Sequence, residues 1–301
     1  MKDIIIIGGG PAGLTAALYA GRAKLDTLVF EKQFQGGQMV NTNEVENYPG
    51  MPETTGPELT AAMYDHAIRF GAEIAYEDVI GLEVDYPVKK VITTHGIYET
   101  KSIILAMGAK PRQLGVKKEQ ELWGKGVSYC AICDGGFFRD KEVAVVGGGD
   151  TAIEDALYLS RIAKKVYLIH RRDKLRATPI LQDRLFASNV EIIWDSQVTQ
   201  LHSEQKLTGI EITHVNNRAE RDIDVQGLFV AVGSIPSTQL VRGIVDLNEQ
   251  GYIEANERCE TNKKGVFAAG DIRDKELRQI ITAAADGAIC VYQAEKYILT
   301  I

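Results

Sequence analysis

The residues best suited to chemistry in this chain are Cys130 and Cys133, two cysteines separated by two residues. This spacing lets the sulfurs meet across the first turn of a helix, whose N-terminus stabilises a thiolate. Asp134 follows directly and can accept or deliver the proton that thiol–disulfide exchange requires. The pattern favours a redox-active dithiol, with half of a zinc site and an inert buried pair as alternatives. Zinc needs two more ligands, and Cys259 and Cys290 are isolated without ligand spacing, so we expect no metal.

Two glycine-rich turns, Gly8–Gly13 and Gly147–Ala152, lie on either side of the dithiol, and each follows an apolar run and opens a predicted helix. The first glycine of such a turn allows the bend, and the second lets the backbone approach a pyrophosphate at the helix N-terminus. One such turn is weak evidence, but two copies in the same context predict two dinucleotide sites. The residues expected at the phosphates are Gly8, Gly10, Pro11, Ala12 and Gly13 in the first copy, and Gly147, Gly149, Asp150 and Thr151 in the second.

The two copies differ at the end of their second strand. The first copy has Glu31 there, an acid expected to accept hydrogen bonds from a ribose hydroxyl. The second copy has His170 followed by Arg171 and Arg172, with Arg176 close behind. Guanidinium groups bind phosphate oxygens bidentately, so this cluster suits a 2′-phosphate, although a solvated strand end is the simpler alternative. We therefore expect FAD at the first turn and NADPH, not NADH, at the second.

The elements that position these residues repeat in the same order in two parts of the chain: a buried strand, the glycine turn, a helix, a second strand and then short alternating strands. Strands are expected at 3–7, 27–31, 142–146, 165–169 and 226–232, with several short strands within 79–105 and 190–215. Helices are expected at 11–22, 56–71, from the second turn to 162, and at 280–298. Span 56–71 is expected to be an amphipathic helix, with Leu59, Met63, Ala67 and Phe70 near one face.

This duplication predicts an α/β fold of two Rossmann-like, three-layer ββα nucleotide-binding domains. The FAD domain is expected to be discontinuous, over 1–112 and 241–301, with the NADPH domain inserted at 113–240. The dithiol lies shortly before the second turn, so it shares a domain with the nicotinamide site, while the flavin belongs to the other. We therefore expect rotation about hinges near 110–116 and 233–245.

Composition excludes several classes of protein. The formal net charge of −7 argues against nucleic acid as a partner, because phosphate binding draws on clustered Lys and Arg. Residues 4–21 carry no charge, but Pro11 and five glycines at fingerprint spacing argue against a signal peptide, and no other segment is long and apolar enough for a membrane helix. We expect a cytoplasmic protein. In 301 residues the two nucleotide domains leave little room for a further domain with a His–Glu base, which favours Asp134 as a local acid.

Along essentially its whole length the sequence resembles the bacterial low-molecular-weight thioredoxin reductases. The segments that carry the resemblance are 8–13, 36–38, 44–50, 130–135, 147–152, 170–177, 265–271 and 278–279. The departures are Met107, where the family usually has Thr, and Asp150, where many members have Asn. Neither position carries the chemistry.

The resemblance implies a homodimeric flavoprotein that reduces thioredoxin with NADPH. It implies that Cys133 lies nearer the flavin, that Cys130 exchanges with the thioredoxin disulfide, and that Asp134 is the acid–base residue. Besides the first turn, the FAD contacts it implies are Glu31, Gly37, Gln38, Asn47, Gly270, Asp271, Arg278 and Gln279. Alternatives are a reductase of another small redoxin or peroxidase component, a ferredoxin-driven reductase, a dithiol oxidase that uses oxygen, and a flavin redox sensor without turnover.

Overall fold

The chain divides into two compact units, one built from Met1–Lys110 with Ile235–Ile301 and the other from Pro111–Ser234. The structure is a computed structural model and describes residues 1–41, 45 and 47–301. The return to the first unit falls at Ile235, earlier in the chain than position 241. The two segments that connect the units pair with one another as short strands, β7 (Ala109–Pro111) and β16 (Ser234–Pro236).

The first unit contains a seven-stranded sheet in the order β3-β2-β1-β6-β5-β4, and β17 also pairs with β6. Strands β1, β2, β3, β6 and β17 run parallel, while β4 and β5 form an antiparallel meander with β6. The strands are β1 (Lys2–Ile7), β2 (Thr27–Glu31), β3 (Glu73–Tyr76), β4 (Val79–Glu83), β5 (Lys89–Thr93), β6 (Ile97–Leu105) and β17 (Val266–Ala268). The α-helices are α1 (Pro11–Arg22), α2 (Gly56–Arg69) and α6 (Ile280–Ile298).

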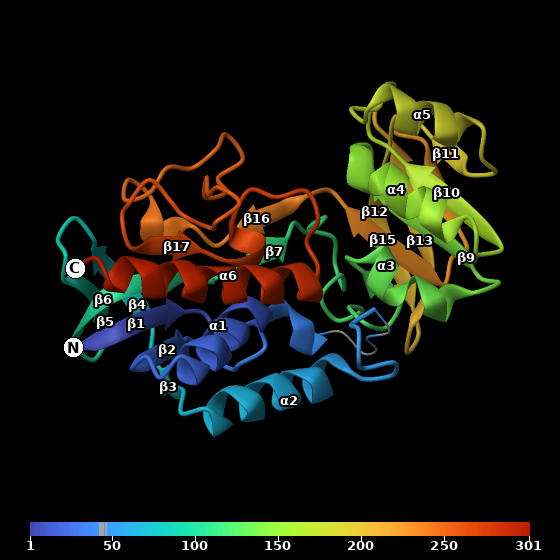
Figure 1. Ribbon diagram of the computed structural model, residues 1–301. Helices are drawn as coiled ribbons and strands as arrows, with labels where there is room; N and C mark the ends of the chain where they lie inside the picture. The colour runs from blue at the N-terminus through green and yellow to red at the C-terminus, as the bar shows by residue number, and fades with distance from the viewer. Residues whose placement is uncertain (42–44, 46) are drawn as a thin grey trace. The chain divides into compact units, whose positions relative to one another are not determined.

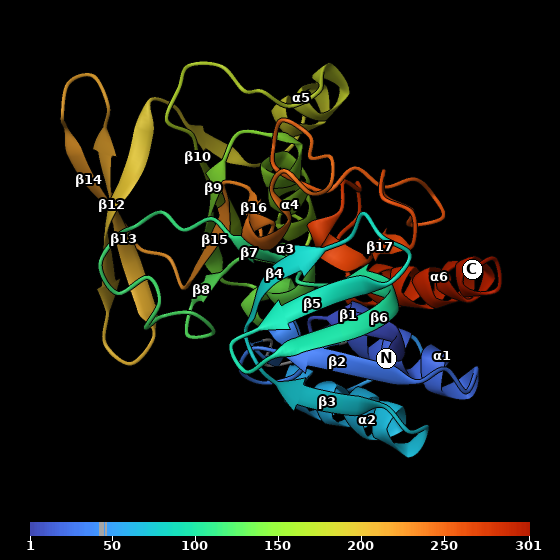
Figure 2. The same cartoon turned by 90° about the vertical axis from the view of Figure 1, so that its left-hand side faces the viewer.

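Strand β1 shows why an uncharged run forms a central strand. Alternate side chains point to opposite faces, so Ile4 and Ile6 enter the core under the helices, while Ile5 and Ile7 enter the core on the other face. Helices α1 and α6 lie side by side on the first of these faces (Figures 1 and 2). A Cβ at Gly287 of α6 would collide with the carbonyl oxygen of Ala12, so only glycine permits this close approach.

The second unit repeats the plan. A five-stranded parallel sheet has the order β11-β10-β9-β15-β8, and a three-stranded antiparallel sheet has the order β12-β13-β14. The strands are β8 (Val127–Ser128), β9 (Glu142–Gly147), β10 (Lys165–Ile169), β11 (Glu191–Ile193), β12 (Ser196–Ser203), β13 (Leu207–His214), β14 (Glu220–Ile223) and β15 (Gly227–Ala231). The α-helices are α3 (Ala131–Asp134), α4 (Asp150–Leu159) and α5 (Pro179–Phe186). In β9, Val143 and Val145 face the helical core and Ala144 and Val146 face the antiparallel sheet.

Two helices end earlier than expected. Helix α2 ends at Arg69, and Phe70 just beyond it is 38% exposed, with its ring against Arg22 and His66 at the surface. Helix α4 ends at Leu159, since the next residues close a tight turn in which the N–H of Ile162 bonds to Leu159. In the described part of the chain, no helix is long and apolar enough to cross a membrane.

Candidate active site

Cys130 and Cys133 form a disulfide at the start of α3. Cys130 is the N-cap of this single helical turn, and its Sγ accepts a hydrogen bond from the backbone N–H of Cys133 at 3.2 Å. Both residues are partly exposed. The other two cysteines, Cys259 and Cys290, are buried free thiols of the first unit. A redox-capable pair is therefore held at a helix start where the backbone N–H groups favour a thiolate.

The carboxyl group of Asp134 is fixed beside the dithiol by Ser128. The Ser128 hydroxyl donates to Asp134 Oδ2 at 2.6 Å, and its oxygen accepts from the backbone N–H of Cys130 at 3.1 Å. Burial raises the pKa of Asp134 above its ordinary value, and the hydrogen bond from Ser128 partly opposes this rise. A carboxyl with a raised pKa is a better proton donor and acceptor near neutral pH than an exposed one.

Replacing Ser128 with Ala should raise the pKa of Asp134 further, because the hydrogen bond that stabilises the carboxylate is lost. Any step that needs protonated Asp134 should then extend to higher pH. The measurement is the pH dependence of the reaction between the reduced dithiol and a disulfide substrate. Ser160→Ala is the control, because among the described residues the Ser160 hydroxyl donates only to the carbonyl of Leu157. An unchanged profile in Ser128→Ala would contradict the assignment of Asp134 as the titrating group.

A buried carboxylate, Glu119, is bonded to Tyr129, the residue before the dithiol. Glu119 is only 2% exposed and accepts hydrogen bonds from the Tyr129 hydroxyl at 2.9 Å and from the N–H groups of Leu114 and Gly115 at 2.9 and 2.8 Å. Burial and this carboxylate raise the pKa of Tyr129. Tyr129, the residue before Cys130, is thus tied through Glu119 to the backbone at 114–115. Sequence reasoning missed Glu119, since it lies in a polar run, 117–121, that carries no signal of burial.

The first glycine turn has the shape of a phosphate cradle. Gly8 has φ +108°, and a Cβ there would strike the carbonyl of Ala106, while a Cβ at Gly13 would strike the carbonyl of Gly8. At Gly10, in contrast, the nearest atom to an added Cβ is the Cα of Gly37 at 3.9 Å. The first and third positions therefore need glycine for packing, whereas the second leaves room for a ligand over the N-terminus of α1.

The Glu31 carboxylate lies beside this cradle, held by the N–H groups of Gly9 at 2.8 Å and Lys32 at 2.7 Å. Two other expected FAD contacts, Asn47 and Gln279, are far apart in the sequence but bonded to one another. Asn47 Nδ2 donates to Gln279 Oε1 at 3.1 Å. Gln38 is exposed on the short helix that starts at Gly37. Positions 44 and 46 of the segment that resembles the family lie outside the described residues.

Two polar atoms of the first unit show that the residues fit a polar ligand. Asp271 Oδ1 and Arg278 Nε are buried and have no hydrogen-bond partner among the residues that the structure describes. Burial raises the pKa of Asp271, while Lys275 and Arg278 lower it. Buried polar atoms normally have partners, and a ribityl hydroxyl or a phosphate of FAD would supply them.

The second turn is built in the same way. A Cβ at Gly147 would strike the carbonyl of Ala231, whereas Gly149 has no atom within 4 Å of an added Cβ. Asp150 Oδ1 accepts from the N–H of Thr178 at 2.7 Å, so this departure from the family pattern joins α4 to the loop before α5. Thr151 follows on α4 and is exposed. The turn is therefore open to a ligand at its second glycine.

The four residues expected to receive a 2′-phosphate differ in position. Arg171, Arg172 and Arg176 are exposed, and their guanidinium groups make no ion pair or hydrogen bond within 1–41, 45 and 47–301. His170 is 5% exposed instead; its ring fills the space beside Gly148, and its Nε2 lies 2.9 Å from the carbonyl of Lys174. Unlike the three exposed arginines, the His170 ring is enclosed and supports the turn, and its role toward a phosphate stays a prediction.

Gly149→Ala separates folding from ligand binding at this turn. Gly149 has φ −97° and open space around its Cβ position, so the free energy of unfolding should change by less than about 1 kcal/mol. The added methyl group would lie where a pyrophosphate approaches, so the KM for NADPH should rise at least roughly tenfold. Thermal unfolding and steady-state kinetics measure the two effects. Gly96→Ala, equally open but remote in sequence, should change neither. Loss of stability in Gly149→Ala would contradict the assignment.

Comparison with known proteins identifies the class. The family model for pyridine nucleotide-disulphide oxidoreductases matches residues 2–287, and the chain belongs to this family. Within it, the chain is 46% identical to the thioredoxin reductase of Bacillus subtilis, over 98% of this chain and 94% of the relative. It is 48% identical to the thioredoxin reductase of Listeria monocytogenes, over 98% and 93%.

Solved structures agree with these relatives. The crystal structure of thioredoxin reductase from Streptococcus pyogenes matches with a TM-score of 0.93 at 45% identity and covers 100% of this chain and 99% of that one. Thioredoxin reductase from Giardia duodenalis matches with a TM-score of 0.92 at 39% identity, over 100% and 99%. The expected family resemblance and the fold of Rossmann-like units are confirmed.

Proposed function

We propose that this protein is an NADPH-dependent thioredoxin-disulfide reductase in which electrons pass through FAD and the Cys130–Cys133 pair. The observation that carries the proposal is the oxidised cysteine pair with a partly buried Asp134 beside it, on the same unit as an arginine-flanked glycine turn. The first turn, Glu31, Asp271, Arg278 and Gln279 would hold FAD, and the second turn with Arg171, Arg172 and Arg176 would hold NADPH.

FAD and NADPH, when bound, supply the two electrons that reduce the disulfide. The residues of the chain then carry the thiol chemistry. The thiolate of Cys130 attacks one sulfur of oxidised thioredoxin, which forms a mixed disulfide and releases a thiolate of thioredoxin. The thiolate of Cys133 then attacks Cys130, which restores the Cys130–Cys133 disulfide and releases the second thioredoxin thiolate. Asp134 gives a proton to a leaving thiolate, and two electrons have passed to thioredoxin.

The surface beside the dithiol suits a protein substrate. Ile132, between the two cysteines, is 48% exposed, and Phe137 is 40% exposed a few residues later. Exposed apolar side chains around a redox pair can pack against a partner and hold its disulfide in place.

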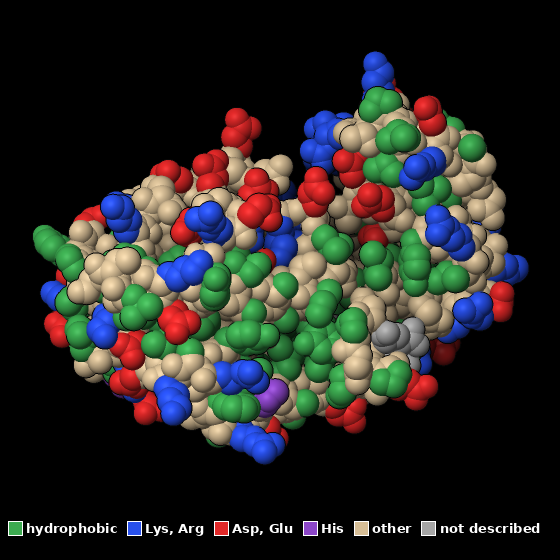
Figure 3. Space-filling view, in the orientation of Figure 1, with side chains coloured by type: hydrophobic (Ala, Val, Ile, Leu, Met, Phe, Trp, Pro, Cys, Tyr) green, Lys and Arg blue, Asp and Glu red, His purple; other side chains and the backbone are tan. Residues whose placement is uncertain are grey.

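We also propose a cytoplasmic homodimer. Apolar side chains are visible over α1 and α6, where Tyr19 and Tyr292 are 46% and 58% exposed (Figure 3). Sedimentation of the purified protein measures the oligomeric state.

The proposal is tested by stopped-flow absorbance of the flavin. NADPH should bleach the flavin rapidly, and oxidised thioredoxin should restore its colour over many cycles. A redox sensor would bleach without recycling, an oxygen-using oxidase would recycle without thioredoxin, and a ferredoxin-driven enzyme would not respond to NADPH.

Because the first glycine turn and the dithiol belong to different units, we propose that the units rotate about their two connections during turnover.

A further inference from the structure

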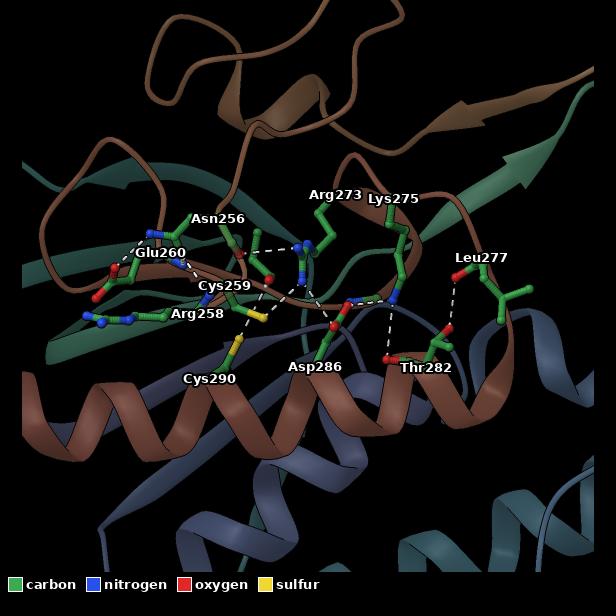
Figure 4. A network of polar contacts seen from close by, with 12 residues as sticks. Asn256, Arg258, Cys259, Glu260, Arg273, Lys275, Leu277, Thr282, Asp286 and Cys290 are labelled. Carbon is green, nitrogen blue, oxygen red and sulfur yellow. Dashed lines mark hydrogen bonds and ion pairs between the residues drawn. The ribbon is translucent and has the colours of Figure 1, made fainter. Parts of the chain in front are cut away.

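A buried ionic cluster lies against α6, next to the turn at Gly270 and Asp271 but made of residues that the proposed function does not use. Asp286 Oδ1 pairs with Arg273 Nη1 at 3.1 Å, and Asp286 Oδ2 pairs with Lys275 Nζ at 2.7 Å. The side chains of Asp286 and Arg273 are each 8% exposed and that of Lys275 is 12% exposed. Figure 4 shows both cations reaching down from the preceding loop to this one carboxylate. Burying three charges is costly, and apolar residues of similar volume often give equal or greater stability. We therefore ask what this cluster does besides stabilise the fold.

The same carboxylate also holds the backbone of a turn. Asp286 Oδ2 accepts a hydrogen bond from the N–H of Gly270 at 2.9 Å. Gly270 has φ +78°, and a Cβ there would lie 3.1 Å from the Cβ of Ala12 in the first glycine turn. Asp271, whose buried Oδ1 has no partner among the described residues, comes directly after it. Asp286 therefore holds the backbone N–H of the residue that immediately precedes Asp271.

The two cations fasten the rest of the loop. Lys275 Nζ donates to the carbonyl of Thr282 at 3.3 Å as well as to Asp286, which fixes the loop on the first turn of α6. Arg273 donates to Cys259 Sγ and to the carbonyl of Asn256, both at 3.2 Å. Residues 270–275 are thus bonded to one carboxylate at both ends, and this loop leads directly to Arg278 and Gln279.

We infer that Asp286 is a positioning residue for FAD: by accepting from Gly270 it presents Asp271 to the cofactor, while Arg273 and Lys275 hold its carboxylate in place. The inference rests on the proposed function, because it assumes that the first unit binds FAD. The Asp286 carboxylate is bonded to Gly270, Arg273 and Lys275. It acts through the turn, and its sequence position on a helix gives no sign of this role.

The test must separate positioning from mere stability, because Asp286→Ala alone would leave two buried cations unpaired and can fail to fold. Two matched triple variants avoid this. Both carry Arg273→Met and Lys275→Met, and they differ only in carrying Asp286→Asn or Asp286→Leu. The Asn variant keeps a carbonyl oxygen that can accept from Gly270, whereas the Leu variant keeps none. Val291→Ala, an apolar truncation on the same helix, is the control for general loosening of α6.

The readouts are flavin content of the full-length purified protein, release of flavin fluorescence after dilution, and thermal unfolding after flavin removal. The Leu variant should release FAD at least about tenfold faster than the Asn variant, at similar unfolding temperatures. Val291→Ala should unfold at a lower temperature with unchanged release. Equal FAD release from the two triple variants would overturn the role of Asp286. FAD release from Val291→Ala as fast as that from the Leu variant would overturn it too. A wild-type protein that neither contains nor takes up FAD would instead overturn the proposed function, and this inference with it.

Discussion

Replacing both Cys130 and Cys133 with serine should abolish reduction of thioredoxin, with a loss in kcat on the order of 10⁴ or more. A serine hydroxyl cannot form the mixed disulfide or accept two electrons as a pair, so no route remains from the flavin to a protein disulfide. Reduction of the flavin by NADPH should survive, because neither cysteine lies in a glycine turn. The measurements are steady-state reduction of thioredoxin and single-turnover bleaching of the flavin.

The single variants divide the roles. Cys130→Ser should still be reducible at the flavin but unable to form the mixed disulfide, and Cys133→Ser should accumulate a mixed disulfide that does not resolve. Cys290→Ser is the matched control, because this thiol is fully buried in the first unit and lies outside the proposed path. Wild-type turnover in the double variant would end the proposal that electrons leave through this pair.

Replacing Arg171 and Arg172 with alanine should lower kcat/KM for NADPH by roughly 100-fold and leave kcat/KM for NADH nearly unchanged. Both guanidinium groups are exposed and make no ion pair within the described residues, so their removal disturbs no internal contact. Charge-assisted hydrogen bonds to a 2′-phosphate are the interactions lost, and NADH lacks that phosphate. Steady-state kinetics with each nucleotide give the ratio.

The control for this prediction is Arg184→Ala, which removes an exposed guanidinium from α5 of the same unit. It should change neither value beyond general screening of charge. Equal losses for NADPH and NADH in the double variant would show that the arginines hold a part common to both nucleotides.

Local pattern was enough to predict the elements that build the two sites. β1, α1, β2 and α6 lie where their apolar runs and caps place them, because a fully apolar strand and a glycine turn at its end are short-range signals. The dithiol was predictable for the same reason, since its spacing alone places both sulfurs on one turn. The short elements β8 and α5 carry too few residues to show a period, and neither was expected.

The supporting residues could not be predicted, since their partners lie far away in the sequence. Asp286 is bonded to a turn that precedes α6, and Glu119 is bonded to backbone groups and a tyrosine that the fold brings around it. His170 shows the reverse problem. Its place beside two arginines suggests a shared role, but the direction of its side chain depends on the space beside Gly148, which no sequence pattern reveals.

The discontinuity of the first unit sets an order of events on the ribosome. The alanines of α1 share one core with Ala283 and Ala294 of α6, so this face of the nascent chain has no permanent cover until the last helix emerges. The second unit, whose residues are consecutive, can fold before the C-terminal part of the first unit has been synthesised. The newly made polypeptide would therefore complete its dithiol-bearing unit early, and the residues proposed to hold and position FAD, Asp271, Arg278 and Asp286, are translated after it.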